Sequence, residues 1–224
     1  MIEIYKILGI ILIPFIKFNL KARIKKGKEI FNRHEERYGI SSFKLKNNRK
    51  LIWIHAASVG EFKSADYFIS KYFDKYNILI TTTTLSAANY AFKHYNNKII
   101  HQFIPLDVSI WVKRFLNKWQ PKLIIWIESD LWPVTLNEFK KRKIKAILVN
   151  LRLSPKSQKR WEKFPYFYDN LLNSFSEIFA QSKIDLTRIK TITNREINYI
   201  GNIKLATIQS FNYKNKKIKS INDS

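Results

Sequence analysis

The sequence contains no cysteine, which excludes disulfide bonds and thiolate metal sites. Its four histidines, His34, His55, His94 and His101, do not form a metal-ligand motif such as HExxH. The glycine-rich phosphate loops GxGxxG and GxxxxGKS/T are also missing. These absences argue against a Rossmann dehydrogenase and a P-loop NTPase, and we expect neither a cofactor nor a bound metal.

Acidic residues are few, since 17 Asp and Glu accompany 41 Lys and Arg, and the formal net charge is +24. A surface this basic attracts polyanions such as nucleic acid, anionic lipid or a phosphorylated substrate. Lys, Asn and Ile are all abundant, so drift in base composition accounts for part of the charge. No nucleic-acid-binding motif accompanies the charge, so nucleic acid is the weakest of these candidate partners.

Long hydrophobic runs are also lacking. The first apolar segment, Ile7–Ile16, has ten residues, whereas a helix needs about 20 to cross a bilayer. Five cations without an acid follow between Lys21 and Lys28. An apolar helix that leads into a basic cluster is typical of an interfacial anchor on an anionic membrane, on its cytoplasmic side. The alternative is a buried helix followed by a solvated basic turn.

Beyond this N-terminal segment (residues 1–30), apolar runs with strand character alternate with segments of helical length, such as Phe62–Tyr76 and Val108–Trp119. This alternation predicts βαβ units, and therefore an α/β fold with a mostly parallel, Rossmann-like sheet and helices on both faces, over residues 31–206. Residues 207–224 are polar and are expected to be a tail or linker. The expected strands are Leu51–His55, Asn77–Thr83, Ile99–Ile104, Lys122–Glu128, Lys145–Asn150, Glu177–Gln181 and Asn198–Ile200.

Polar residues follow almost every expected strand, where ligands bind in open α/β sheets. After the first strand, Ser58 and Glu61 have the spacing of a helix capping box, which is a purely structural role. Alternatively, Glu61 is a general base that takes a proton from an acceptor hydroxyl. Gly60 would let a substrate approach the backbone closely. The nearby helix N-terminus is expected to lower the pKa of Glu61 and keep it ionised.

Two more acids follow the fourth expected strand. Glu128 directly follows a buried run, where an unpaired acid is costly. A helix cap by Ser129 or Asp130 would explain Asp130 but not Glu128. No third acid or histidine lies nearby in sequence, so a metal site is disfavoured. Donors and positive charge are expected on the same rim from Arg152, Ser154 and Lys204.

Taken together, these stretches resemble the bacterial 3-deoxy-D-manno-octulosonic acid (Kdo) transferase family of two-domain GT-B glycosyltransferases. The matching motifs occur in family order over roughly residues 1–206. They are Glu36-Arg37-Tyr38-Gly39, His55-Ala56-Ala57-Ser58-Val59-Gly60-Glu61, Pro105-Leu106-Asp107, Arg114-Phe115-Leu116, Pro121-Lys122-Leu123, Glu128-Ser129-Asp130-Leu131-Trp132-Pro133, Asn150-Leu151-Arg152-Leu153-Ser154 and Gly201-Asn202-Ile203-Lys204.

The resemblance implies that Glu61 is the catalytic base and that Glu128 and Lys204 stabilise the transition state. Ser58, Gly60, Asp130, Arg152 and Ser154 are the expected substrate-binding residues. The implied reaction, which needs no metal, transfers Kdo from CMP-Kdo to a lipid A precursor, lipid IVA, at the cytoplasmic face of the inner membrane.

Two departures from the family pattern stand out: Asp130 replaces the usual Glu, and Ser86-Ala87 replaces the usual Thr-Gly. The sequence also lacks the C-terminal domain that holds CMP-Kdo in the family, so we expect that domain or a partner chain to supply the donor. The alternative is a non-catalytic remnant that binds anionic lipid.

Overall fold

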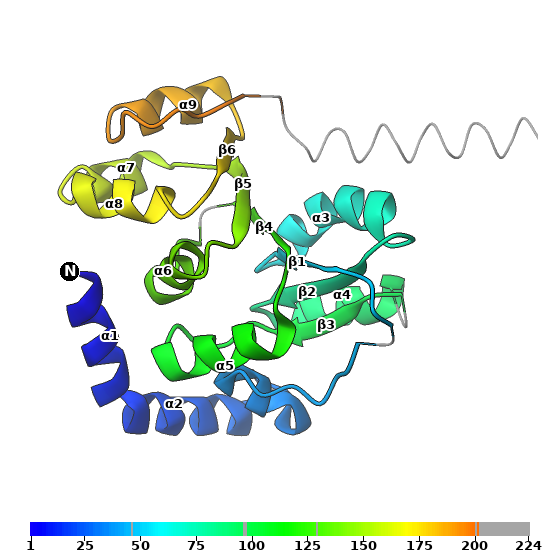
Figure 1. The fold of residues 1–224 in the computed structure, drawn as a ribbon. Coiled ribbons are helices and arrows are strands. Elements are labelled where there is room, and N and C mark those ends of the chain that lie inside the picture. The colour runs from blue at the N-terminus through cyan, green and yellow to red at the C-terminus, as the bar shows by residue number, and fades with distance from the viewer. Residues whose placement is uncertain (46, 96–97, 129, 200, 202–224) are drawn as a thin grey trace, which may run out of the picture.

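Helices and strands alternate along the computed structural model of the chain, and its strands form one sheet (Figure 1). The structure describes residues 1–201 except 46, 96–97, 129 and 200. Within this part of the chain, six parallel strands lie in the order β3-β2-β1-β4-β5-β6. This is the strand order of a Rossmann-type sheet, so the predicted α/β fold with a parallel sheet is confirmed. The strands are β1 (Leu51–His55), β2 (Asn77–Thr82), β3 (Ile100–Phe103), β4 (Leu123–Ile127), β5 (Lys145–Leu151) and β6 (Glu177–Ala180).

The apolar strands are explained by burial on both faces of the sheet. Every residue of β1 is buried. Because successive side chains of a strand point to opposite faces, Ile52 and Ile54 pack in one apolar cluster and Trp53 packs in the other. The ring of Trp53 lies 4.7 Å from that of Phe115 and 5.5 Å from that of Phe139, measured between centroids. A strand covered on both sides needs apolar residues at every position, which is the pattern in the sequence.

Helices supply the cover on each face, as expected. The helices α3 (Val59–Tyr72) and α4 (Leu85–Tyr95) contribute to the cluster that contains Ile52 and Ile54. The opposite cluster draws on α5 (Ser109–Trp119), α6 (Pro133–Lys141), α8 (Pro165–Leu172) and α9 (Lys183–Lys190). A short helix, α7 (Pro155–Trp161), directly follows β5. The predicted helix Phe62–Tyr76 begins three residues earlier than expected, because Ser58 caps it.

The N-terminal segment forms two helices, α1 (Ile2–Ile11) and α2 (Ile13–Lys25), where the sequence predicted one apolar helix over Ile7–Ile16. Pro14 explains the break, because it lacks the N–H that would bond to the carbonyl of Ile10. α1 lies against α5 and α6, and α2 lies against the 3₁₀ helix η1 (Phe31–Tyr38) (Figure 1). Among the described residues, no helix is both long enough and apolar enough to span a bilayer.

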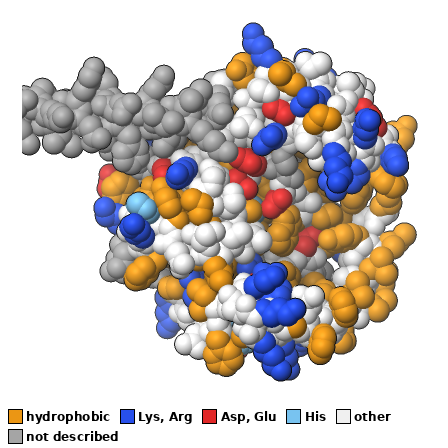
Figure 2. Space-filling view, turned by 180° about the vertical axis from the view of Figure 1, so that it is seen from behind, with side chains coloured by type: hydrophobic (Ala, Val, Ile, Leu, Met, Phe, Trp, Pro, Cys, Tyr) orange, Lys and Arg blue, Asp and Glu red, His pale blue; other side chains and the backbone are white. Residues whose placement is uncertain are grey.

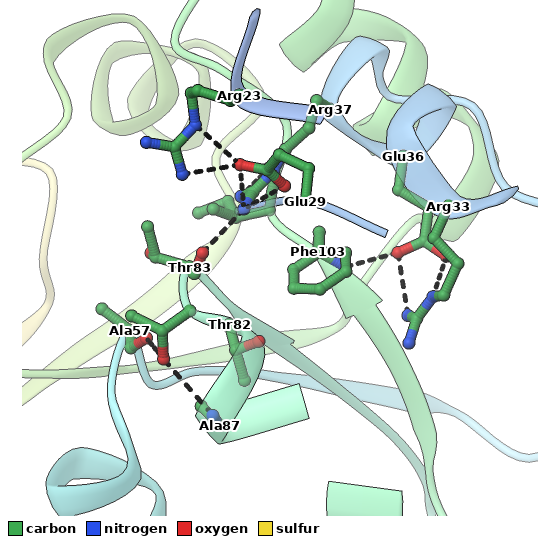
Figure 3. Close-up of polar contacts among 12 residues, drawn as sticks. Arg23, Glu29, Arg33, Glu36, Arg37, Ala57, Thr82, Thr83, Ala87 and Phe103 are labelled. Carbon is green, nitrogen blue, oxygen red and sulfur yellow. Dashed lines mark hydrogen bonds and ion pairs between the residues drawn. The ribbon is translucent and has the colours of Figure 1, made fainter. Parts of the chain in front are cut away.

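A buried ion-pair cluster joins α2 and η1 to the sheet (Figure 3). The Arg37 guanidinium donates to both carboxylate oxygens of Glu29, at 3.0 Å to Oε2, and also to the Thr83 carbonyl at 2.6 Å. From α2, Arg23 donates to Glu29 Oε1 at 2.8 Å. Arg37 and Glu29 are both buried, and the cluster therefore fixes the N-terminal helices beside the end of β2.

Gly39 shows why η1 ends where it does. Its φ is +71°, and a Cβ there would lie 2.2 Å from the Trp111 carbonyl oxygen. Only glycine fits such a close approach in the left-handed region. The glycine of the Glu36-Arg37-Tyr38-Gly39 motif is therefore required by the close packing of the end of η1 against α5.

Of the predicted seventh strand, Asn198 forms one isolated parallel bridge to Phe179, and Ile200 lies outside the described residues. The expected tail, residues 207–224, and Lys204 also lie outside them.

Candidate functional site

The carboxyl ends of β1 and β4 lie side by side at the centre of the sheet. Here the strand order reverses, because β1 connects toward β2 and β4 toward β5. Open α/β sheets bind ligands at this switch point. Glu61 stands in the first turn of the helix that follows β1, and Glu128 directly follows β4. The fold thus brings two of the predicted catalytic residues to one place.

Glu61 forms the capping box that the sequence predicted. Its own N–H donates to Ser58 Oγ at 3.4 Å, and Ser58 Oγ donates to Glu61 Oε1 at 3.1 Å. The second carboxylate oxygen, Oε2, accepts a 2.6 Å hydrogen bond from the Ala57 N–H. A carboxylate has about four acceptor positions, so these two bonds leave lone pairs for a further proton. Capping and base catalysis are therefore geometrically compatible.

The pKa of Glu61 is raised to about 7, mainly by burial, with Glu128 and Asp130 adding repulsion. The expected lowering by the helix N-terminus is wrong, because loss of hydration outweighs the hydrogen bonds from Ala57 and Ser58. A carboxyl with a pKa near 7 is a stronger base than an ordinary one and is still half ionised at neutral pH. The environment of Glu61 therefore suits proton transfer.

Glu128 has a left-handed backbone, with a φ of +65°. Its N–H donates to the Val149 carbonyl at 2.9 Å, so the backbone is held to the neighbouring strand up to this point. On the next strand, Asn150 also has a positive φ, +55°. Such conformations are costly for residues other than glycine and cluster at functional sites. The two adjoining strands are thus both distorted where the candidate site lies.

Asp130 is exposed on the same loop, and its pKa is raised by partial desolvation and then by Glu128. Its carbonyl accepts a 2.7 Å hydrogen bond from Nε1 of the buried Trp126, which ties the loop to the core. The proposed helix cap by Asp130 is wrong, because Trp132 is the N-cap residue of α6 and its own side chain makes no capping hydrogen bond. Ser129 lies outside the described residues.

Asp107 caps α6 instead, from the loop after β3. Its carboxylate accepts hydrogen bonds from the Val134 N–H at 2.9 Å, the Thr135 N–H at 2.8 Å and the Thr135 hydroxyl at 2.7 Å. Sequence spacing could not predict this contact, because the partners lie 27 and 28 residues apart. Asp107 therefore fixes the start of α6, which follows the loop that carries Glu128.

The remaining predicted substrate-binding residues lie in three different surroundings. Ser154 caps α7 by accepting from the Ser157 N–H at 3.2 Å, and Arg152 lines a cavity beside Asp130 and Trp132. Gly60 is exposed, and a Cβ there would meet nothing closer than Ser58 Oγ at 3.8 Å. The fold itself therefore does not require glycine at position 60.

One buried side chain at the site had no predicted role. His55, at the end of β1, is fully buried, and its pKa is lowered to about 3 mainly by that burial. Its ring centroid lies 4.1 Å from that of Trp126 and 6.3 Å from that of Trp132. Nδ1 lies 3.0 Å from Thr81 Oγ1, whereas Nε2 has no hydrogen-bond partner among the described residues. The neutral imidazole thus packs against Trp126 and near Trp132, the two tryptophans that flank the Glu128 loop in the sequence.

Among the described residues, no group of three or more His, Asp or Glu is arranged to hold a metal ion. The acids at the switch point instead stand close enough for Glu128 and Asp130 to raise the pKa of Glu61. The fold and the site together define a Rossmann-type domain with a cluster of carboxylates at the switch point of its sheet.

Comparison with known proteins then identifies the family. A family model described as 3-deoxy-D-manno-octulosonic-acid transferase (kdotransferase) matches residues 32–207. The chain therefore belongs to the Kdo transferase family of glycosyltransferases.

Its relatives include the 3-deoxy-D-manno-octulosonic acid transferase of Rickettsia bellii, 39% identical over 209 residues that cover 92% of this chain and 50% of the relative. A probable mitochondrial enzyme of the same name from Arabidopsis thaliana is 33% identical and covers 99% of this chain and 51% of the relative. The Haemophilus influenzae transferase is 32% identical over 75% of this chain and 41% of the relative. The chain thus spans about half the length of the curated relatives that it matches.

Proposed function

We propose that this chain is the acceptor-binding, base-bearing half of an enzyme that transfers Kdo from CMP-Kdo to a lipid A precursor, lipid IVA. The observation that carries the proposal is Glu61: a carboxyl with a pKa raised to about 7, placed at the switch point of the sheet beside Glu128. Family membership supplies the class of reaction.

In the proposed reaction, an acceptor hydroxyl oxygen attacks the anomeric carbon of Kdo while the bond from that carbon to the CMP phosphate breaks. Glu61 takes the hydroxyl proton, and CMP leaves with the bonding electron pair. Positive charge develops on the sugar in such transfers. The Glu128 carboxylate favours this charge, and the Lys204 ammonium favours the negative charge on the departing phosphate. Metal is not required for this charge balance.

In this proposal, the donor site lies outside the described residues. Because the chain spans about half of its relatives, CMP-Kdo is held by a further domain or by a partner chain in this proposal. Glu61 and Glu128 then form one wall of a cleft that closes around the two substrates. The described part of the chain alone is expected to bind acceptor without transferring sugar.

The N-terminal helices support attachment to a membrane surface. On α1 and α2, large apolar side chains face solvent, including Ile11 at 66% exposure, Phe15 at 65% and Phe18 at 72%. Figure 2 shows hydrophobic side chains along one edge of the molecule, with Lys and Arg nearby. The exposed basic residues of α2 and the turn after it are Lys17, Lys21, Arg23, Lys25, Lys26 and Lys28. Apolar side chains beside cations fit the interface of an anionic membrane, which we assign to the cytoplasmic face of the inner membrane.

The same exposed helices favour a second function, that of a non-catalytic remnant that holds anionic lipid. Membrane binding alone does not separate the two functions, because both need it. Transfer activity does separate them. When the donor half is supplied, the enzyme half transfers Kdo and depends on Glu61, whereas a lipid-binding remnant shows no transfer. The comparison of Glu61→Gln with the unchanged chain therefore tests the proposed function.

A further inference from the structure

A cavity lies at the amino ends of the strands, opposite the end of the sheet that carries Glu61 and Glu128. It has a volume of about 330 Å³, and it is lined by Arg49 just before β1, Asn77 at the start of β2 and Ile100 at the start of β3. Glu61 and Glu128 instead follow the carboxyl ends of β1 and β4. Because the six strands are parallel, these two ends of the sheet are separate, and the cavity is distinct from the candidate functional site.

Helices α3 and α4 and the chain segment 43–49 form the walls of this cavity. Two small residues of α4, Ala88 and Ala91, line it and leave room beside the sheet. Figure 1 shows β3 and α4 on the side of the molecule away from α1. The cavity therefore lies apart from the helix that we propose to contact a membrane, and a soluble ligand fits its position better than a lipid headgroup does.

The backbone around the cavity is held in place by hydrogen bonds. The side-chain amide of Asn77 donates to the Arg49 carbonyl at 2.8 Å, and the Asn77 N–H donates to the Lys50 carbonyl at 3.0 Å. On the other side, the Lys98 N–H donates to the Tyr95 carbonyl at 2.9 Å. A ligand would thus enter a preformed site, which reduces the ordering cost of binding.

The lining of the cavity carries positive charge without a compensating acid. Arg33, Lys44, Arg49 and Lys98 line it, and no Asp or Glu of the described chain does. Arg33 is paired with Glu36, whereas the other three cations form no ion pair with any residue that the structure describes. Cations gathered around a concave site attract an anion and raise its local concentration. The charge therefore predicts an anionic ligand.

Aromatic rings in the wall are partly open to solvent. Phe43 is 40% exposed and Phe73 is 36% exposed, and Tyr76 lines the cavity beside them. Aromatic rings next to cations are the combination that binds nucleotides, because the rings stack on the base and the cations pair with the phosphate. An inorganic anion would leave the rings unused, and a neutral aromatic molecule would leave the cations unused. A ligand with both a flat ring and a phosphate matches the whole lining.

We propose that the cavity between Arg49, Phe73 and Lys98 binds a nucleoside monophosphate, with its base against the aromatic wall and its phosphate beside the cations. The volume lies at the lower end of the range for small-molecule sites, which suits a single nucleotide. This binding needs neither Glu61 nor a donor half, so it does not rest on the proposed function. It is also distinct from the site for CMP-Kdo, which that function places outside the described residues.

A calorimetric titration of the full chain with adenosine 5′-monophosphate (AMP), ribose 5-phosphate and adenosine tests the proposal. We expect saturable binding of AMP, at least about tenfold tighter than that of either other probe, because each probe lacks the stacking or the charge-assisted contact. Equal affinity for AMP and ribose 5-phosphate would overturn the assignment to a nucleotide. Equal affinity for AMP and adenosine would overturn the anion site, and absence of saturable AMP binding would overturn both.

Charge variants locate the phosphate. Arg49→Gln and Lys98→Gln should each weaken AMP binding about tenfold, because each removes a charged donor. Lys93→Gln is the matched control, since Lys93 is exposed on α4 but does not line the cavity. If Lys93→Gln weakens binding as much as Lys98→Gln does, AMP is attracted to the basic surface as a whole and the specific site is wrong.

A ring variant locates the base. Phe73→Leu stays apolar but loses the flat ring, so it should weaken AMP binding about tenfold and leave ribose 5-phosphate binding unchanged. Phe164→Leu is the matched control, because Phe164 is 52% exposed and does not line the cavity. The melting temperature of each variant reports whether its fold is kept, and AMP should raise that of the wild-type chain because it binds the folded state. Wild-type affinity of Phe73→Leu for AMP would contradict stacking in this cavity.

Discussion

The N–H of Ala57 donates a 2.6 Å hydrogen bond to Oε2 of Glu61, so the backbone at the end of β1 holds the proposed base in position. Ser58 Oγ bonds to the other carboxylate oxygen. A capping box and a catalytic base are usually alternatives, but here one carboxylate can serve as both. The cap orients the side chain, and burial raises the pKa of Glu61 to a value at which proton transfer is efficient.

The first prediction concerns Gly39, where a left-handed backbone coincides with a close contact. Gly39→Ala should lower the free energy of unfolding by several kcal/mol, because its Cβ would lie 2.2 Å from the Trp111 carbonyl oxygen. Gly27→Ala is the matched control, since its φ is +66° but nothing lies within 4 Å of its Cβ. Gly27→Ala should lower the free energy of unfolding by about 1–2 kcal/mol, because only the left-handed backbone is unfavourable for alanine there. Urea unfolding measures both, and equal losses would contradict the packing at Gly39.

The second prediction concerns the buried pair of Arg37 and Glu29. Arg37→Ala should destabilise the fold by about 3–5 kcal/mol, because it removes the buried partner of a buried carboxylate. Lys145→Ala breaks the pair with Glu177, in which both side chains are largely exposed, and should cost less than about 1 kcal/mol. Urea unfolding compares the two. If Arg37→Ala costs no more than Lys145→Ala, the ion-pair cluster does not fix the N-terminal helices.

Sequence alone could predict the sheet and part of the site. The strands are continuous apolar runs because both faces are buried, and the Ser58–Glu61 spacing specifies a local capping box. The pKa of Glu61 could not be predicted, because it depends on burial and on acids that approach only when β1 pairs with β4.

Neither the cap on α6 nor the backbone conformation of Glu128 could be predicted from the sequence. Asp107 reaches α6 across 27 residues of chain, and no local spacing marks that contact. The positive φ of Glu128 arises where β4 leaves its hydrogen bonds with β5. By contrast, Pro14 was visible in the sequence, and it could have shown that the apolar segment breaks into two helices.

The third prediction concerns the membrane. Phe18→Ser on α2 should weaken binding to vesicles that contain anionic lipid by about tenfold, as expected for removal of one partly inserted aromatic side chain. Phe92→Ser on α4 is the matched control, because Phe18 and Phe92 are both 72% exposed. Vesicle co-sedimentation measures the binding, and high salt should release part of the bound protein because the Lys residues of α2 contribute. Equal losses for the two variants would place the membrane-binding surface elsewhere.

The fourth prediction concerns the pH dependence of stability. The pKa of Glu61 rises from an ordinary value of 4.5 to about 7 on folding, so the folded chain holds this proton more tightly. The stabilisation is fully present below pH 4.5 and is lost as the pH rises through about 7. The free energy of unfolding of the wild-type chain, taken relative to that of Glu61→Gln, should therefore fall by on the order of 2 kcal/mol between these pH values.

Urea unfolding of both proteins across this range measures the difference, and the Gln variant cancels the contribution of the other titrating groups. A difference that stays constant with pH would mean that the pKa of Glu61 is not raised by folding. If the wild-type chain instead becomes more stable relative to Glu61→Gln as the pH rises, folding lowers the pKa of Glu61.

The central claim is that Glu61 is the base in Kdo transfer. Glutamine at position 61 can still accept the Ala57 N–H, so the cap is largely kept while the basic oxygen is lost. Ser182→Ala is the matched cap control, because Ser182 accepts the Asp185 N–H at 3.0 Å in a similar box at the start of α9. Loss of that cap should cost about 1 kcal/mol of stability with little effect on turnover.

The most direct measurement is the rate of Kdo transfer from CMP-Kdo to lipid IVA, with the donor half supplied, set against the melting temperature of the same proteins. We predict that Glu61→Gln slows transfer by about 10² to 10⁴ while its melting temperature stays near that of the unchanged chain. Ser182→Ala should give the reverse pattern. Near-normal transfer by Glu61→Gln, together with a lowered melting temperature, would contradict the account and leave Glu61 as a helix cap alone.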